Sequence, residues 1–228
     1  PLSPAIEPGA KPGPAGQGLQ QAVHSRQAGA AQAPRITMST AIKTQYYTAT
    51  SLDGFIATED DSIEWLFPLG DVNDTGYPGF IADVGALAMG SATYRWMVRH
   101  AQKVAQAAGS PWPYRQPTWV FSHGTLPAVP GADVRFVQGD VRPVHDEMLR
   151  AAGGRNLWIV GGGDVAGQFF DAGLLDEVIV QVASVTLGRG KPLFPRRATD
   201  PSWRLRSVRQ MGPGFEELRY ELPARQTA

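Results

Sequence analysis

Cysteine is absent from the 228 residues of this sequence. Its absence excludes disulfide bonds, zinc sites built from thiolates and a cysteine nucleophile, and nothing marks the compartment as oxidising. The motifs of a zinc deaminase and the Gly-x-Ser-x-Gly elbow of a serine hydrolase are missing as well. The histidines lack the spacing of metal ligands, so no metal site is predicted. They are His24, His100, His123 and His145.

A net charge and a long apolar run are also missing. The 21 basic and 21 acidic residues cancel, so no global field draws the chain to nucleic acid or to an anionic membrane. No apolar run approaches the roughly 20 residues that span a bilayer, and the N-terminus lacks the pattern of a secretory signal. We therefore expect a cytoplasmic protein whose partners are a small-molecule substrate and a second copy of itself.

Aromatic residues are absent before Tyr46. The residues before about position 40 are mainly Ala, Gly, Pro and Gln, and they cannot bury enough apolar surface to offset the entropy lost on ordering. We predict a disordered tail over 1–40 and one domain over 41–228, where most of the 43% hydrophobic residues can form a single core.

Beyond the tail, apolar strand-like runs alternate with helical patterns, which is typical of an α/β sheet with helices on its faces. Strands are predicted over 44–50, 86–89, 118–121, 133–137 and 156–160. Helices are predicted over 74–83, 91–106, 141–151 and 164–172, with Asp74 and Asp164 as caps. Strand-like segments without helices between them follow at 177–183, 203–210 and 215–222, and should pair partly antiparallel at one edge. The expected sheet is mixed, with about eight strands.

The most informative segment is an apolar strand that runs into three glycines and a helix, Ile159-Val160-Gly161-Gly162-Gly163-Asp164-Val165. Such a turn presents backbone N–H groups and the positive end of the helix dipole, and glycine lets a pyrophosphate approach the backbone. Gly161-x-Gly163-x-x-Ala166 also satisfies the Rossmann fingerprint. In that fold an acidic residue at the end of the next strand binds the ribose, whereas here the acids Asp176 and Glu177 stand at the start of the next strand. A glycine turn that serves only close helix packing is the alternative without a ligand.

Three weaker segments accompany this turn. Met89-Gly90-Ser91-Ala92-Thr93-Tyr94 is again a strand end, a glycine and a helix start, where free amides and a hydroxyl could take phosphate oxygens. Ser122 and His123 close the strand 118–121, where a ribose phosphate could sit. Asp53-Gly54 breaks the first strand, and a tight turn explains it without any function.

Taken in this order and at these separations, the segments resemble the dihydrofolate reductase superfamily, closest to its RibD C-terminal type, the reductase of bacterial riboflavin biosynthesis. The resemblance covers about Lys43 to the C-terminus, and it implies a three-layer dihydrofolate reductase-like fold with a mixed, mostly parallel sheet. Four motifs carry it: Ser51-Leu52-Asp53-Gly54 with Ile56-Ala57, Met89-Gly90-x-x-Thr93-Tyr94, Ile159-Val160-Gly161-Gly162-Gly163, and Thr186-Leu187-Gly188-x-Gly190-x-Pro192-Leu193-Phe194.

The resemblance also implies a nicotinamide cofactor and its contacts. Most relatives carry a basic residue where this chain has Ser91, and many carry arginine at His123. NADPH is expected, with NADH possible, because a 2′-phosphate normally needs a guanidinium or ammonium partner. Arg95 or Arg115 could substitute. The implied cofactor residues are Ala49, Ile56, Gly90, Ser91, Ala92, Thr93, Ser122, His123, Val160, Gly161, Gly162, Gly163, Asp164 and Val165.

By the same resemblance, the activity is hydride transfer to a C=N bond of a pterin-like or ribosylamino-pyrimidine substrate, in a homodimer. The catalytic candidates are Asp74, Asp53 and Trp65, and the substrate candidates are Gln181 and Glu64. Gln181 could face the pocket, point to solvent on an edge strand, or meet a partner subunit. A non-catalytic module of the same fold that binds a nucleotide or flavin is the alternative function.

Overall fold

A computed structural model describes residues 41–71, 74–102, 105, 109–199 and 202–223. The predicted tail over 1–40 lies outside these residues, so its disorder stays a prediction. In the described part of the chain, no helix is long and apolar enough to cross a membrane.

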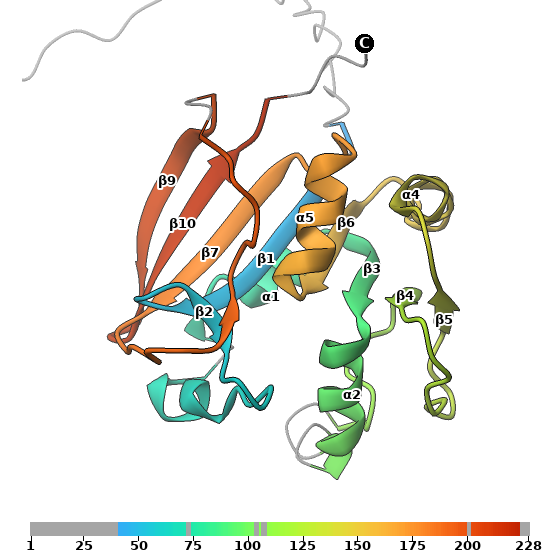
Figure 1. Cartoon of the computed structure of the whole chain (residues 1–228), viewed down its shortest axis with the longest axis horizontal. Coiled ribbons are helices and arrows are strands. Elements are labelled where there is room, and N and C mark those ends of the chain that lie inside the picture. Colours follow the sequence, from blue (N-terminus) through green and yellow to red (C-terminus); the bar gives the residue numbers. More distant parts are fainter. Residues whose placement is uncertain (1–40, 72–73, 103–104, 106–108, 200–201, 224–228) are drawn as a thin grey trace, which may run out of the picture. The chain divides into compact units, whose positions relative to one another are not determined.

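The centre of the fold is an eight-stranded sheet with the order β5-β4-β3-β6-β1-β7-β10-β9 (Figure 1). Its strands are β1 Thr44–Ser51, β3 Val84–Gly90, β4 Thr118–Phe121, β5 Val134–Val137, β6 Asn156–Gly161, β7 Glu177–Ala183, β9 Arg204–Met211 and β10 Phe215–Glu221. The pairings from β5 to β7 are parallel, whereas β10 runs antiparallel to both β7 and β9. The predicted mixed sheet with an antiparallel C-terminal edge is confirmed.

A second, two-stranded sheet pairs β2 Phe55–Ala57 with β8 Lys191–Pro192 in antiparallel fashion. The two strands approach so closely at Gly190 that a side chain there would lie 2.1 Å from the carbonyl oxygen of Ala57. Only glycine fits this contact, which brings the residue before β8 next to the end of β2.

The helices that lie wholly within the described residues are α1 Tyr77–Ala82, α2 Ser91–Arg99, α4 Val141–Ala151 and α5 Gly163–Asp171, with a 3-10 helix, η1, at Glu64–Leu69. The caps predicted at Asp74 and Asp164 are wrong. The caps are Gly76, which precedes a first turn containing proline, and Gly162, so α5 already begins at Gly163. Part of the helix predicted over 91–106 lies outside the described residues.

The core lies on both faces of the sheet because successive residues of β1 point to opposite sides. Tyr46 packs with Met148 of α4 and Phe169 of α5 on one face. Tyr47 packs with Phe80 of α1 on the other. The sheet therefore has a helical layer on each side, with α4 and α5 on one and α1 and α2 on the other (Figure 1).

Candidate active site

A cleft of about 550 Å³ opens at the edge where the parallel strands β1, β3 and β6 end. Strand ends, helix starts, η1 and the two-stranded sheet all contribute to its wall. The lining residues are Thr48, Ala49, Ile56, Ala57, Asp61, Ile63, Leu66, Ala92, Thr93, Trp96, Met97, Tyr114, Val160, Gly161, Gly162, Gly163, Asp164, Lys191, Pro192 and Pro195. This edge is where α/β sheets usually bind ligands.

Glycine occupies the three positions from the end of β6 to the start of α5 for different structural reasons. A methyl group at Gly163 would lie 2.3 Å from the carbonyl oxygen of Leu193, so close packing against the residues after β8 requires glycine there. A methyl group added at Gly162 would have Ile56 Cδ1, at 3.8 Å, as its nearest neighbour among the described residues outside the adjacent residues of the chain, which is an ordinary contact. Gly161 has a φ of +153°, and the Gly161–Gly162 peptide bond is cis. Helix packing thus explains Gly163 but leaves Gly162 as bare backbone facing the cleft.

The start of α2 faces this glycine turn across the cleft. A Cβ atom added to Gly161 would lie 3.4 Å from Thr93 Oγ1. A Cβ atom added to Gly90 would lie 3.2 Å from Val165 Cγ2. No described side chain caps α2 or α5, whereas Asp140 caps α4 by accepting a hydrogen bond from the amide of Arg142. First-turn amides have no partner within their helix, so two sets of N–H groups converge at what we call the glycine end of the cleft.

The other end of the cleft is aromatic and apolar. Trp96 and Met97 lie one turn beyond Ala92 and Thr93 on α2, and Tyr114 packs edge-on against Trp158 with ring centroids 5.5 Å apart. Burial raises the pKa of the Tyr114 hydroxyl well above its usual range, so it stays protonated at neutral pH. We call this the aromatic end, and define it as Ile63, Leu66, Trp96, Met97 and Tyr114.

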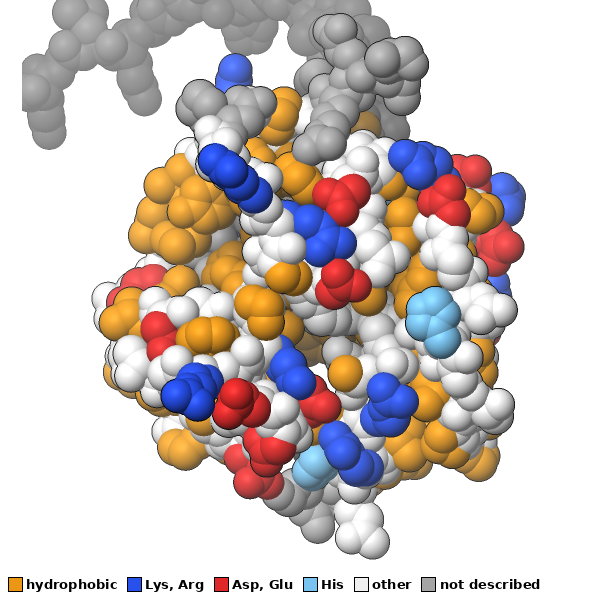
Figure 2. Space-filling view, in the orientation of Figure 1, with side chains coloured by type: hydrophobic (Ala, Val, Ile, Leu, Met, Phe, Trp, Pro, Cys, Tyr) orange, Lys and Arg blue, Asp and Glu red, His pale blue; other side chains and the backbone are white. Residues whose placement is uncertain are grey.

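Charged side chains at the cleft are few and are paired. Lys191 Nζ lies 3.5 Å from Asp61 Oδ1. Asp164 accepts a hydrogen bond of 3.1 Å from Arg196, which also binds Asp171. Figure 2 shows acidic and basic side chains interspersed over this face, so no patch of one sign surrounds the cleft.

Comparison with known proteins identifies the family. Residues 115–216 match the family model described as RibD C-terminal domain. The uncharacterized protein YwjB of Bacillus subtilis is 32% identical over 174 residues, which cover 76% of this chain and 95% of YwjB. The chain belongs to the RibD C-terminal domain family.

Solved structures agree with this assignment. A putative riboflavin biosynthesis protein from Shewanella sp. PV-4 is 27% identical, with a TM-score of 0.62 over 79% of this chain and 98% of its own. The dihydrofolate reductase of Enterococcus faecalis, solved in complex with NADP(H) and RAB-propyl, shares the fold at 18% identity and a TM-score of 0.51, over 78% of this chain and 95% of its own. The RibD C-terminal family is thus reductase-like, and the fold is that of dihydrofolate reductase.

The structure brings most of the predicted cofactor residues to one cleft. Nine of them line it: Ala49, Ile56, Ala92, Thr93, Val160, Gly161, Gly162, Gly163 and Asp164. Gly90 and Val165 lie directly behind this lining. Gly90 pairs with Phe121 across β3 and β4, so Ser91 and Ser122, the next residues, continue neighbouring strands at the same edge. His123 is exposed beside them.

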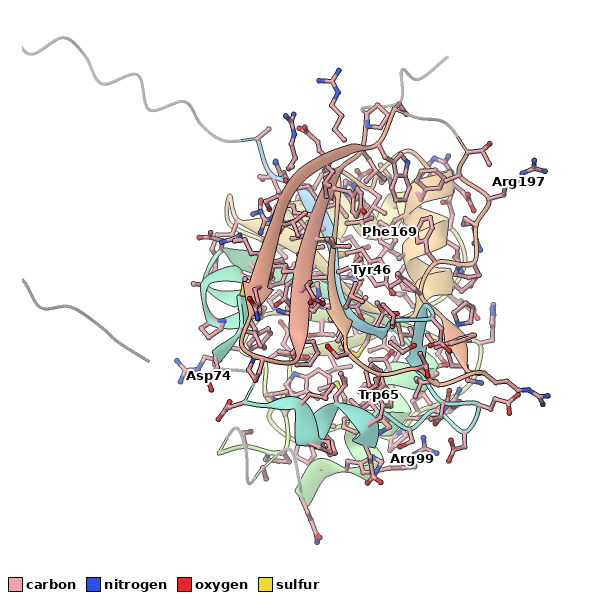
Figure 3. All side chains as sticks on the ribbon, turned by 90° about the vertical axis from the view of Figure 1, so that its left-hand side faces the viewer. Tyr46, Trp65, Asp74, Arg99, Phe169 and Arg197 are labelled. Carbon is pink, nitrogen blue, oxygen red and sulfur yellow. The ribbon has the colours of Figure 1, made fainter. Side chains whose placement is uncertain are left out.

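The predicted catalytic residues lie outside the lining. The Asp53 carboxylate accepts hydrogen bonds from the Ser51 hydroxyl and from the amides of Leu187 and Gly188, and these bonds hold its pKa below the usual range. Asp53 therefore anchors the loop before β8. Figure 3 shows Asp74 at the outer margin of the molecule, well apart from Trp65.

The substrate candidates are also outside the lining. Gln181 is buried, and its side-chain amide donates a 2.7 Å hydrogen bond to the Tyr47 hydroxyl. The alternative that it points to solvent on an edge strand is wrong, because β7 lies between β1 and β10. Glu64 is exposed at the start of η1.

Sequence reasoning missed the residues of the aromatic end and Lys191. Helical spacing offered a signal for two of them, since Trp96 and Met97 follow Thr93 by three and four residues and share its face of α2. Tyr114 and Lys191 reach the cleft from a loop and from β8, so no local pattern in the sequence indicates them.

Proposed function

We propose that this protein is a nicotinamide-dependent reductase that transfers hydride to a planar heterocycle, of the pterin-like or ribosylamino-pyrimidine kind that the family resemblance implies. The supporting observation is the glycine end, where two helices without side-chain caps begin on either side of bare backbone at Gly162. Amides arranged in this way suit the diphosphate of a dinucleotide.

In this proposal the cofactor lies along the edge of the sheet. Ala49 and Ile56 would hold the nicotinamide, the amides of both helix starts would hold the diphosphate, and Ser122 and His123 would hold the adenosine end. The residues fit such a group, because Gly162 lines the cleft and a side chain built there would meet Ile56 Cδ1 only at 3.8 Å, an ordinary contact without a clash. When bound, the reduced nicotinamide supplies the hydride.

The cofactor in this proposal is NADPH, and Arg95 supplies the missing cation. The Arg95 guanidinium turns back along α2 and donates a 2.9 Å hydrogen bond to Ser91 Oγ. It thus lies beside Ser91, the position where the family resemblance implies a basic residue. A guanidinium there can hold a 2′-phosphate.

The chain's own residues would align donor and acceptor and exclude water. Trp96, Met97 and Tyr114 form an apolar wall one helical turn from the phosphate amides. The Tyr114 hydroxyl remains protonated and offers a hydrogen-bond donor at this wall. We also propose that the protein is a cytoplasmic homodimer that associates through β9, where Leu205 and Val208 are exposed.

Cofactor binding tests the proposal directly. Titration of NADPH and NADH by fluorescence should show binding that Gly162→Asp abolishes, because a carboxylate would occupy the phosphate path. The matched control is Gly79→Asp in α1, where nothing lies within 4 Å of the added side chain. Both variants should keep the circular dichroism of the parent. Retained NADPH affinity in Gly162→Asp would refute this placement of the phosphates.

A non-catalytic module that binds a nucleotide or flavin is the second candidate. This candidate is favoured because the described lining offers no unpaired carboxylic acid for catalysis. Its two carboxylates, Asp61 and Asp164, are both in ion pairs. Tight nucleotide binding without oxidation of NADPH by any acceptor would support the module over the reductase.

A further inference from the structure

The two ends of the cleft have different electrostatic character. The glycine end offers backbone amides, which suit anions. The aromatic end contains five apolar or aromatic residues and, among the described residues that line it, no basic side chain. An anionic group at the aromatic end would therefore lose water without gaining a charged partner, since the donors there are neutral.

Lys191 does not change this balance. It is the one basic residue in the described lining, and its ammonium group is already 3.5 Å from the carboxylate of Asp61. Asp164 is the other charged lining residue, and Arg196 from outside the lining pairs with it. Every charged side chain of the described lining is thus already in an ion pair, so none of them is free to receive a second anion beside the cofactor.

The aromatic end suits flat rings. Tyr114 is held by edge-on contacts with Trp112 at 5.6 Å and Trp158 at 5.5 Å between ring centroids. Trp96 stacks on His100 at 4.4 Å. Rings fixed in this way offer a large apolar surface with little further loss of side-chain freedom.

We infer that the acceptor which this protein reduces is an uncharged, unphosphorylated planar ring with a polarised C=O or C=N bond. This inference rests on the proposed function and narrows its substrate class. A phosphoribosylated pyrimidine, or a folate with its glutamate carboxylates, would place an anion where the aromatic end has no cation to receive it. In the reaction, hydride passes from C4 of the reduced nicotinamide to the electrophilic carbon. The π electron pair moves to oxygen or nitrogen, which takes a proton from water, and the oxidised nicotinamide leaves.

A matched pair of acceptors tests the inference. Isatin and isatin-5-sulfonate share one planar dicarbonyl ring and differ by a sulfonate. The full chain is assayed for NADPH oxidation with each, and the binding of each is measured by quenching of tryptophan fluorescence, with and without cofactor. We expect isatin to be preferred about tenfold or more in kcat/KM and in affinity. Equal use of both acceptors, preference for the sulfonate, or binding of neither overturns the inference.

A charge added to the aromatic end should reverse this selectivity. Leu66→Arg places a guanidinium in η1, which has no buried residue, so the fold should tolerate it. The ratio of sulfonate to isatin turnover should rise about tenfold in this variant. Pro68→Arg adds the same charge at an exposed position of the same short helix outside the described cleft lining, and should leave the ratio unchanged. An equal rise in both variants would show that the charge acts from a distance, against the inference.

The two failures can be told apart. If NADPH does not bind but isatin still binds about tenfold more tightly than its sulfonate, the proposed function fails and the charge selectivity of the cleft stands. If NADPH binds and the sulfonate is used as well as isatin, the substrate class fails and the reductase stands.

Discussion

The contrast between Gly162 and Gly163 can be measured as a difference in stability. In Gly163→Ala the new methyl group would lie 2.3 Å from the carbonyl oxygen of Leu193 and 2.6 Å from that of Pro192. Both are backbone atoms of the segment at β8, so the clash is relieved only by moving that segment. Overpacking of this kind costs about 1 to 3 kcal/mol.

In Gly162→Ala the methyl group would instead make an ordinary contact with Ile56 Cδ1 at 3.8 Å. Gly162 has a φ of −84° and a ψ of −179°, which alanine adopts without strain. Its free energy of unfolding should therefore stay within about 0.5 kcal/mol of the parent.

Urea unfolding followed by circular dichroism gives the free energy of unfolding of both variants. In thermal unfolding, a loss of about 1 kcal/mol should lower Tm by roughly 2 to 4 °C in a domain of this size. Parent-like stability of Gly163→Ala would refute the close approach of β8 to α5. A large loss in Gly162→Ala would refute the view that Gly162 is open to a ligand.

Two further outcomes are expected. Arg95→Ala should lower the affinity for NADPH about tenfold while leaving the affinity for NADH unchanged, since a charge-assisted hydrogen bond contributes about 1.5 to 3 kcal/mol. Arg99→Ala in the same helix is the control, and equal losses of affinity for both cofactors in Arg95→Ala would contradict the assigned role. Burial lowers the pKa of His145, whose Nε2 lies 2.8 Å from Thr44 Oγ1, so the folded protein holds this imidazole neutral. Its contribution to stability is present above the unfolded pKa of about 6.5 and is lost as pH falls through the lower folded pKa. Urea midpoints should therefore decline from pH 7.5 to pH 5 less steeply in His145→Gln than in the parent, and parallel slopes would show that His145 does not titrate in this way.

The sequence predicts the fold well because its signals are local. The apolar run of β6, the glycines after it and the helical spacing of α5 lie within the sixteen residues from Asn156 to Asp171, and they form one continuous unit in the structure. The nine predicted cofactor residues that line the cleft come from three short segments far apart in the sequence, and the family resemblance, not a local signal, predicts that these segments share one site.

The remainder of the site depends on contacts between distant segments. Lys191 reaches the cleft because β8 pairs with β2, which lies more than 130 residues earlier in the sequence. The hydrogen bond from the amide of Gly188 to the Asp53 carboxylate joins the same two distant segments. The reason for Gly163 is also distant, since the atoms that exclude a side chain belong to Pro192 and Leu193. Gln181 is polar within an apolar strand, and only the position of β7 inside the sheet shows that Tyr47 satisfies it.

The central position of β1 sets the order in which this protein can fold. Its two neighbours in the sheet, β6 and β7, begin at Asn156 and Glu177, so β1, the first strand of the described residues, has no neighbour in this sheet until over a hundred more residues have been synthesised. At ribosomal speeds that wait is on the order of ten seconds. During this time the nascent chain exposes an unpaired strand, and any fragment that stops before β6 keeps that exposed edge permanently.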